Sequence, residues 1–532
     1  MTFLPCGRFI PRVPQSLIQT SLYKLFMKRS LFLILVAAGA LHAEDYTFVA
    51  RSSSLTGEIS GYENVTANNI SAGFAGSIGT IKNNNEFSIS GNDNVTLENN
   101  QTTNKGGLFY LQQSAYTNPQ QHTTLNITDN NNVTLSNNFG QTSGGIITAD
   151  NNSNYPEYYS VTNISGNTGN VTISGNSSDG SGGAIWSNGK LNINNNGNVK
   201  FTGNAVNKAN GNWGGAIYMG VSSENAFNIS GNDYVEFRGN YLYKAKSNYV
   251  PEATVRLNSI YQKGTNQANT ISAKTGGSVV FYDAVITESA GSRASYELNA
   301  DYTDADSNTQ KAGGTITFSG KYTQIDLDAF TDTVSNAKES QTSILSANTT
   351  LHNGTLNIEY DAVLQTKNLT INDDATLTLR NGACEVLTGG DLLFKNGSEL
   401  SVTGSNILSA DSITFEDNTV LTLTLSDLNT ESAIINLVTS DLSFTQGTIN
   451  FVGIDSLDDG QYMLLSLGES RLTAADLLTD NLTVSGLAAG DKLEWNETGT
   501  TLYLSHKSIP EPTTATLSLL ALAGLAARRR RR

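Results

Sequence analysis

Reactive side chains are sparse in this 532-residue sequence, and those that cluster are mostly carboxylates. The stretch "DYTDADSN" places Asp301, Asp304 and Asp306 close together, and such oxygen ligands can hold calcium. The stretch lacks the twelve-residue pattern of an EF-hand loop, and an acidic surface loop is the alternative interpretation. We therefore expect no cofactor, with calcium as the one candidate ion.

A second set of carboxylates would suit cleavage of a glycosidic bond. Asp283, Asp326 and Asp328 could meet across neighbouring strands, and paired carboxylates serve as acid and base in glycosidases. The region from Phe87 to Asn232, however, has few carboxylates and no arginine. A polysaccharide-degrading enzyme, either a lyase or a glycoside hydrolase, is therefore retained as the alternative function.

Histidine and cysteine add no reactive centre. His122, His352 and His506 have no metal-binding partner three or four residues away. Cys384 is accompanied only by Cys6 near the N-terminus, so no disulfide framework is expected, as is typical of exported bacterial proteins. Phosphate loops, H-E-x-x-H and G-x-S-x-G are also missing. We expect no catalytic, cofactor-binding or metal-binding residues and no enzymatic activity.

The N-terminal segment carries an export signal. From Met27 the sequence runs "MKRSLFLILVAAGALHAEDY", a basic start, an apolar stretch and small residues before acidic ones. The apolar stretch is shorter than the roughly 20 residues of a spanning helix. We predict a secretory signal peptide over residues 1–43, with translation starting at Met27 and cleavage after Ala43, or alternatively after Ala40. Export would use the Sec machinery.

The last 24 residues, "IPEPTTATLSLLALAGLAARRRRR", contain a second sorting signal. As a helix, residues 513–527 would be about 22 Å long, short of the roughly 30 Å hydrocarbon core. The order of Pro-Glu-Pro, apolar helix and arginine cluster resembles the PEP-CTERM sorting signal of Gram-negative bacteria. The resemblance implies a sorting signal over residues 506–532 that an exosortase cleaves near the Pro-Glu-Pro motif, with transient residence of the helix in the inner membrane. The residues that match this signal are Pro510, Glu511, Pro512, Arg528, Arg529, Arg530, Arg531 and Arg532.

The charge distribution disfavours an anionic partner. The formal net charge is −16, and five Lys and Arg lie before Glu44 while five more arginines end the chain. The body between them is therefore more acidic than the whole chain. Nucleic acid is not expected as a partner.

One phrase recurs six times between Ile59 and Asn240, at spacings of 28 to 38 residues. In the copy "NVKFTGN", Val199 and Phe201 alternate with polar residues, which predicts a strand with one buried face. Such a strand cannot bury its apolar face alone, whereas stacked copies build a continuous core. The copies are "ISGYENVTANN", "ISGNDNVTLENN", "ITDNNNVTLSNN", "ISGNTGNVTISGN", "INNNGNVKFTGN" and "ISGNDYVEFRGN".

A glycine motif lies in all but the first of the gaps, as "GGLFY", "GGIIT", "GGAIW" and "GGAIY". Paired glycines let the chain turn tightly, and Asn at matching corners can form hydrogen-bonded ladders. The predicted fold class is all-β: a right-handed parallel β-helix, or solenoid, with a C-terminal capping section and a short C-terminal apolar helix. The β-helix is expected over 44–430, with repeats strongest at 59–240.

The paired "GGAI" and "FxxN" motifs resemble the repeats of chlamydial-type polymorphic membrane proteins. They occur at Gly182 to Ile185 with Phe201 to Asn204, and again at Gly214 to Ile217 with Phe237 to Asn240. Members of that family are autotransporter passengers with a pectate-lyase-like β-helix. The resemblance covers about residues 55–505 and implies the architecture more strongly than an activity.

The C-terminal half continues the strand pattern. Alternation predicts that Leu356, Ile358 and Tyr360 share one face, as do Leu369 with Ile371 and Leu377 with Leu379. Residues 431–505 contain "DGQYMLLSLGES" and "GDKLEWNETGTTLYLS", which resemble the closing section of autotransporter passengers. That resemblance implies a capping section in which a hairpin carrying a tryptophan covers the last coil.

The expected function is a non-enzymatic protein with an adhesive or extracellular-matrix role. It would act at the cell surface, at the outer membrane or outside a Gram-negative bacterium. Glycans or surface proteins of a host or matrix are the expected partners. Loop tyrosines are candidate contacts, with ordinary surface filler as the alternative interpretation; they are Tyr116, Tyr155, Tyr158, Tyr159 and Tyr249.

Overall fold

The structure of the protein is a computed structural model. The model describes residues 44–50, 54–113, 122–151, 158–207, 213–221, 225–245, 252–331, 333–425, 432–439, 441–467, 482–498 and 500–507. The predicted leader with Ala43 lies outside the described residues, as does nearly all of the sorting tail, including Pro510, Glu511, Pro512 and the five arginines.

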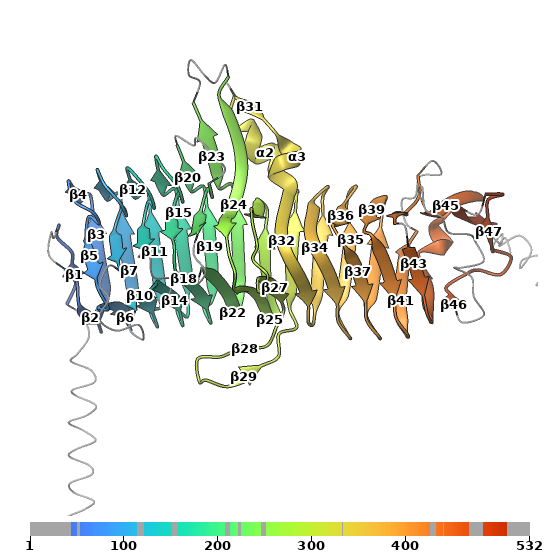
Figure 1. The fold of residues 1–532 in the computed structure, drawn as a ribbon, viewed down its shortest axis with the longest axis horizontal. Helices are drawn as coiled ribbons and strands as arrows, with labels where there is room; N and C mark the ends of the chain where they lie inside the picture. Colours follow the sequence, from blue (N-terminus) through green and yellow to red (C-terminus); the bar gives the residue numbers. More distant parts are fainter. Residues whose placement is uncertain are drawn as a thin grey trace, which may run out of the picture.

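The described chain forms an elongated solenoid built almost entirely of β-strands. Successive coils stack along the long axis, and neighbouring strands pair mainly in parallel (Figure 1). This confirms the predicted all-β, mostly parallel repeat architecture. No helix in the described part of the chain is long and apolar enough to cross a membrane.

Most coils contribute one strand to each of three parallel stacks, and β22, β25, β32 and β34 contribute to two. The first stack contains β2 (Gly57–Ser60), β6 (Glu86–Ser90), β10 (Thr123–Thr128), β14 (Ser160–Ser165), β18 (Lys190–Asn194), β22 (Ala226–Arg238), β25 (Ala268–Phe281), β27 (Ser295–Leu298), β32 (Thr342–Leu351), β34 (Val363–Ile371), β37 (Asp391–Phe394), β40 (Ser412–Phe415) and β43 (Asp441–Phe444).

The second stack follows the first around each coil. It contains β1 (Tyr46–Thr47), β3 (Asn64–Asn68), β7 (Asn94–Glu98), β11 (Asn132–Ser136), β15 (Asn170–Ser174), β19 (Asn198–Thr202), the ends of β22 and β25, β30 (Thr315–Ser319), β33 (Thr355–Glu359), β35 (Thr376–Arg380), β38 (Glu399–Thr403), β41 (Thr419–Thr424), β44 (Gly447–Val452) and β46 (Leu482–Ser485).

The third stack closes each coil. It contains β5 (Gly79–Lys82), β9 (Phe109–Gln112), β13 (Ile147–Asp150), β17 (Ile185–Ser187), β21 (Ile217–Val221), β24 (Thr254–Gly264), β26 (Ala284–Thr287), the starts of β32 and β34, β36 (Glu385–Thr388), β39 (Asn406–Ser409), β42 (Ile435–Val438) and β45 (Gly460–Ser466). Short strands lie between the second and third stacks in the early coils: β4 (Ser71–Ala72), β8 (Gln101–Thr102), β12 (Phe139–Gly140), β16 (Ser177–Ser178) and β20 (Ala205–Val206).

The repeat phrases align residue for residue along the second stack. Their valines pair in register from coil to coil, and all six are buried. Phe201 pairs with Phe237, and the two rings stack with centroids 4.6 Å apart. The solenoid core therefore comes from the predicted apolar alternation. The aligned valines are Val65, Val95, Val133, Val171, Val199 and Val235.

Buried asparagines form hydrogen-bonded ladders at two corners of each early coil, as predicted. The backbone N–H and the Nδ2 of Asn176 both donate to Oδ1 of Asn204, over 3.1 and 3.0 Å. The same Nδ2 also donates to the carbonyl of Leu135 over 2.8 Å. One ladder runs through Asn92, Asn130, Asn167, Asn196 and Asn232, and the other through Asn100, Asn138, Asn176, Asn204 and Asn240.

Paired glycines make the corner before the third stack, because the backbones of neighbouring coils touch there. Gly182 has a φ of +64°, and a Cβ on Gly183 would lie 2.0 Å from the carbonyl oxygen of Gly215. No other residue fits without moving the next coil. The interpretation of these glycines as corner residues is confirmed.

The predicted strand faces of the later coils hold with one exception. Leu356, Ile358 and the other predicted leucines and isoleucine are buried. Tyr360, predicted to share the face of Ile358, instead follows β33 with a φ of +54°. The chain turns at Tyr360 and Asp361, so this tyrosine leaves the core and lies half-buried.

Two insertions protrude from the middle of the rod on opposite sides (Figure 1). On one side β23 (Tyr241–Lys244) pairs antiparallel with β24, beside α2 (Thr323–Asp328), β31 (Val334–Ser335) and α3 (Ala337–Gln341). On the other, β28 (Tyr302–Thr303) and β29 (Thr309–Gln310) form an antiparallel hairpin. Inserted loops in a rigid scaffold commonly carry function.

The C-terminal end departs from parallel stacking. A short 3₁₀ helix (Ile454–Ser456) precedes β45, which pairs antiparallel with β48 (Thr501–His506), and β48 pairs antiparallel with β47 (Lys492–Trp495). Trp495 packs partly buried against the core. The antiparallel strands thus lie at the end of the rod where parallel addition of coils stops.

Candidate functional site

Most of the outer surface of the early coils is an ordered array of uncharged polar side chains. On the first stack, Nδ2 of Asn163 donates to Oδ1 of Asn126 over 2.7 Å, and Asn192 donates to Asn163 over 2.8 Å. On the second stack, outward threonines pair in register; they are Thr66, Thr96, Thr134 and Thr172. Such a surface offers hydrogen bonds but no reactive centre.

A group of charged and aromatic side chains interrupts this array near the middle of the rod. Tyr234, Glu236 and Arg238 occupy the outward positions of β22. Tyr282 follows β25, and Tyr322 and Asp326 come from the start of α2 and from its helical turn. We call these six residues the mid-rod cluster. Segments nearly ninety residues apart thereby share one surface.

The mid-rod cluster is held by charged and aromatic contacts. The guanidinium of Arg238 donates to both carboxylate oxygens of Asp326 over 3.3 and 3.2 Å. It also lies 3.8 Å from the ring centroid of Tyr322, a cation–π contact. Tyr322 packs edge-on against Tyr282 at 4.8 Å, and Tyr234 donates to Glu236 over 2.6 Å. The side chains therefore support one another in fixed positions.

Burial and neighbouring groups shift the pKa of three residues in the cluster. Burial, with nearby Tyr322 and Glu236, raises the pKa of Tyr282 to about 12. Burial and the hydrogen bond to Glu236 raise the pKa of Tyr234 as well. The hydrogen bond to Asp326 raises the pKa of Arg238. The cluster thus presents the neutral phenols of Tyr234 and Tyr282 beside the ion pair of Arg238 with Asp326.

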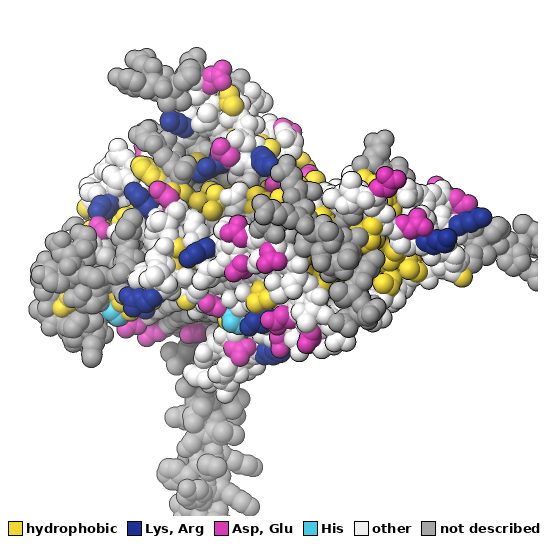
Figure 2. All heavy atoms as spheres, turned by 45° about the vertical axis from the view of Figure 1, so that its right-hand side comes forward, with side chains coloured by type: hydrophobic (Ala, Val, Ile, Leu, Met, Phe, Trp, Pro, Cys, Tyr) yellow, Lys and Arg dark blue, Asp and Glu magenta, His cyan; other side chains and the backbone are white. Residues whose placement is uncertain are grey.

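A second ion pair extends this surface along the rod. The Nε of Arg380 lies 3.0 Å from a carboxylate oxygen of Glu359. Lys321 lies between two rings, 5.3 Å from the centroid of Tyr322 and 5.8 Å from that of Tyr360. Figure 2 shows one face of the molecule, where acidic side chains gather toward the middle of a largely uncharged surface.

The three carboxylates considered for glycoside cleavage have separate environments. Asp283 is buried and accepts hydrogen bonds from the N–H groups of Gly239 and Asn240, so its carboxylate cannot contact a substrate. Asp326 belongs to the mid-rod cluster. Asp328 is exposed and accepts from Gln324 over 2.6 Å. Asp283 and Asp326 both lie near Gly239, whereas Asp328 takes no part in this contact.

The candidate calcium ligands shape a turn. Oδ1 of Asp304 accepts from the N–H groups of Asp306 and Asn308, and Oδ2 accepts from Gln310 over 2.7 Å. The hydrogen bond from Asn308 is the main cause of the lowered pKa of Asp304. Asp301 and Asp306 are exposed. Within the described ranges, no three His, Cys, Asp or Glu side chains group in a way that would hold a metal ion.

The three histidines have structural contacts. His122 stacks on Tyr159 at 3.8 Å, with Lys190 over the same tyrosine ring. His352 lies 2.6 Å from Glu297 and lowers the pKa of that carboxylate. His506 is buried beside Asp491, with Nδ1 2.8 Å from Oδ1. The lone Cys384 is buried, and burial raises the pKa of its thiol to about 11.

The predicted contact tyrosines are only partly described. Tyr158 is buried, with 6% of its surface exposed, so it is not a free contact residue. Tyr159 is half-buried under Lys190. Tyr116, Tyr155 and Tyr249 lie outside the described residues.

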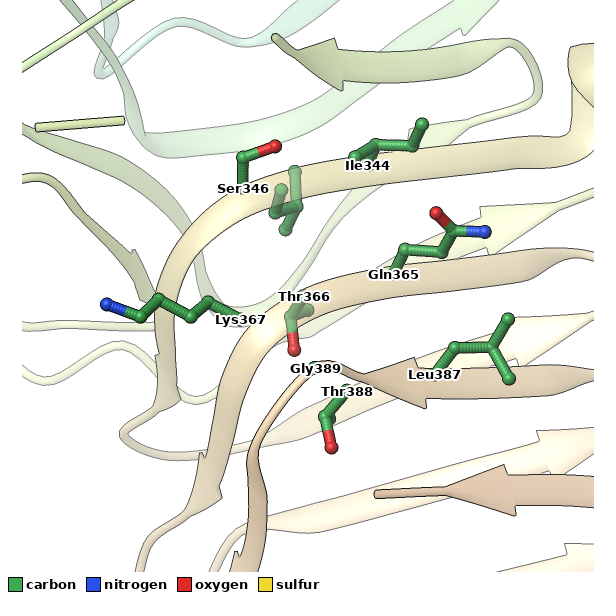
Figure 3. A pocket seen from close by; sticks show the side chains of 9 residues that line it. Ile344, Ser346, Gln365, Thr366, Lys367, Leu387, Thr388 and Gly389 are labelled. Atoms are coloured by element: carbon green, nitrogen blue, oxygen red, sulfur yellow. The ribbon is translucent and has the colours of Figure 1, made fainter. Parts of the chain in front are cut away.

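A shallow hollow of about 500 Å³ crosses three coils further along the rod. Figure 3 shows Ser346 and Lys367 at the bends of β32 and β34, with Ile344, Gln365 and Leu387 on the straight parts of the strands. The lining combines apolar, amide and hydroxyl groups with one ammonium. It offers binding contacts, but its lining residues include no carboxylate or imidazole for acid–base chemistry.

The mid-rod cluster is the feature that sequence reasoning missed. Its signal was present, because "DYVEFR" places aromatic, acidic and basic residues at the outward positions that other copies fill mainly with Asn, Thr and Ser. Tyr282, Tyr322 and Asp326 join it only through folding, since nothing in the spacing of the sequence predicts the position of α2.

Comparison of the chain with protein-family models, with curated proteins and with solved structures finds no match.

Proposed function

We propose that this protein is a non-enzymatic, exported rod that binds glycans or surface proteins in an adhesive or extracellular-matrix role. The observation that carries the proposal is the position of the mid-rod cluster. The surface that breaks the largely uncharged Asn and Thr array lies in the same coils as the two protruding insertions (Figure 1). A rigid scaffold that presents amphipathic aromatic and arginine side chains at one level suits recognition of a partner.

The proposal includes a route to the cell exterior. A signal peptide over residues 1–43, cleaved after Ala43, would direct Sec export, and the tail at Pro510 to Pro512 with its arginines would be processed by an exosortase. The coil would be right-handed, with the strands of residues 431–505 as a cap and residues 513–527 as a short membrane helix. Mass spectrometry of surface material should find the tail removed; an intact C-terminus would contradict processing.

The binding proposal is tested with the purified full chain on a glycan array and in a cell-adhesion assay. Replacing Arg238 by Ala removes the ion pair and the cation–π contact, so binding should weaken about tenfold, as for one desolvated interface contact. Lys200→Ala is the matched control, because Lys200 is an exposed cation in register with Glu236 on the adjoining strand. Equal binding by wild type and Arg238→Ala would remove the cluster from the proposal.

A polysaccharide-degrading enzyme is the second candidate. It is favoured by the convergence of Glu236, Asp326 and Glu359 with two arginines across neighbouring coils, the arrangement that such an enzyme would use. Incubation of the protein with polysaccharides separates the two functions. New reducing ends or unsaturated products, together with no binding to any surface, would establish the enzyme and overturn the adhesive rod.

A further inference from the structure

The hairpin of β28 and β29 folds back over the corner that joins the first and second stacks. It is inserted between β27 and β30, where early coils turn within a few residues. Nδ2 of Asn195 donates to the carbonyl of Thr303 over 3.1 Å, across 108 residues of sequence. The ring of Tyr302 lies over Gly231, where a Cβ would come within 2.8 Å of the ring. The hairpin is therefore fitted to this corner.

A shallow, open pocket of about 310 Å³ lies between the hairpin and the corner. This volume is at the lower end of the range for small-molecule sites, roughly 300–1,000 Å³. Tyr302 and Asp304 line it from the hairpin, and Asn195, Asp233 and Lys274 line it from three successive coils. Asp233 and Lys274 form an ion pair, and both remain partly exposed to the pocket. The turn hydrogen bonds of Asp304 hold the hairpin side in shape.

The lining selects a class of ligand. One aromatic ring, two carboxylates, two amides, a hydroxyl and an ammonium offer a flat apolar surface beside both donors and acceptors. A sugar ring has matching features, since its hydroxyl groups both donate and accept and its C–H faces are apolar. Phosphate and sulfate are disfavoured by the two carboxylates, and a bare cation by the paired ammonium of Lys274.

We propose that this hairpin pocket binds one neutral sugar unit of a glycan, with Tyr302 as the stacking platform and Asp233, Lys274 and Asn195 as the polar contacts. The inference deepens the proposed function, on which its biological meaning rests, but it concerns a site distinct from the mid-rod cluster. The pocket would fix the identity of a sugar, while the mid-rod cluster would contact the rest of the partner.

The test uses the full chain with methyl glycosides of glucose, galactose, mannose and N-acetylglucosamine, followed by saturation-transfer NMR and calorimetric titration. At least one glycoside should bind at millimolar concentration. Tyr302→Ala should weaken binding about tenfold, and Tyr302→Phe, which keeps the ring, by less than about threefold. Asp233→Asn tests the polar contact. Tyr243→Ala, on the opposite protrusion, is the control and should bind as wild type does.

The possible results separate the pocket from the general proposal. The pocket is overturned if no glycoside binds, or if Tyr302→Ala and Asp233→Asn bind glycosides as tightly as wild type does. This holds even if the rod still adheres to surfaces. Tyr302-dependent binding of a glycoside supports the pocket even if the adhesion assays fail, and only the adhesive role is then lost. Since Tyr302 lies outside the solenoid core, unchanged circular dichroism will show that the variants fold.

Discussion

Asp283 is a buried carboxylate at the end of a ladder of asparagines. Its Oδ2 accepts hydrogen bonds from the backbone N–H and the Nδ2 of Asn240, over 2.9 and 2.8 Å. Its Oδ1 accepts from the N–H of Gly239. Burial is the largest influence on this group and raises its pKa to about 7, although the three N–H donors oppose the shift. We therefore expect this single residue to make the stability of the middle coils depend on pH.

The direction of this effect follows from the raised pKa. Between about pH 4 and pH 7 the folded protein holds a proton on Asp283 that the unfolded chain releases, so raising the pH over this window lowers stability. In urea unfolding from pH 4 to 8, wild type should lose stability relative to Asp283→Asn by up to about 1.4 kcal/mol per pH unit.

A neutral change in the same ladder serves as the control for this prediction. Asn138→Ala should lower stability by the same amount at every pH, because it removes hydrogen bonds without changing a titrating group. A difference between wild type and Asp283→Asn that stays constant with pH would contradict a raised pKa.

At the scale of the elements, the buried asparagine ladders and the half-buried ladder on the outer face look alike in sequence but differ in how much they stabilise the fold. Asn176 is buried, and its replacement by Ala removes the acceptor for the backbone N–H and for one side-chain N–H of Asn138, and the amide that donates to the carbonyl of Leu135. We expect a loss of about 3 kcal/mol or more, seen as a lower unfolding midpoint.

The half-buried ladder on the outer face provides the matched comparison. Asn163 donates to Asn126 and accepts from Asn192 on the outer face, where water replaces lost hydrogen bonds. Asn163→Ala should therefore cost less than about 1 kcal/mol. Equal effects of the two substitutions would mean that the corner ladder does not hold the coils together.

The alternation of apolar and polar residues was sufficient to predict the strands and their register, because residues such as Val199 and Phe201 must face one core in every copy. It failed at Tyr360, where two successive residues turn in the left-handed region and end the alternation. It also missed the mid-rod cluster and the hairpin pocket. Both depend on insertions whose packing is set by contacts such as Arg238 with Asp326, and local pattern carries no information on such contacts.

At the scale of the whole molecule, each coil contacts mainly the coil before it and the coil after it. Stability in such a solenoid is approximately a sum over neighbouring pairs, so terminal coils are supported on one side only. Among the described strands, β1 pairs with β3 alone, whereas β15 lies between β11 and β19.

Native-state hydrogen exchange can measure this gradient. Backbone amides of β15 and β19 should exchange about tenfold or more slowly than those of β1 and β3, because opening a central coil breaks two interfaces. Mass spectrometry of peptides from both regions gives the readout. Equal protection along the rod would show that the solenoid opens as one cooperative unit.

The coils differ widely in the length of chain they use while keeping one register. The step from Asn92 to Asn130 takes 38 residues, and the step from Asn348 to Asn368 takes 20, yet each pair of amides meets across neighbouring coils. Residues can therefore be inserted or deleted at a corner of a coil without repacking the core. Mutation can therefore change the loops that such a rod displays, such as the hairpin after β27, without changing the stacked strands that carry them.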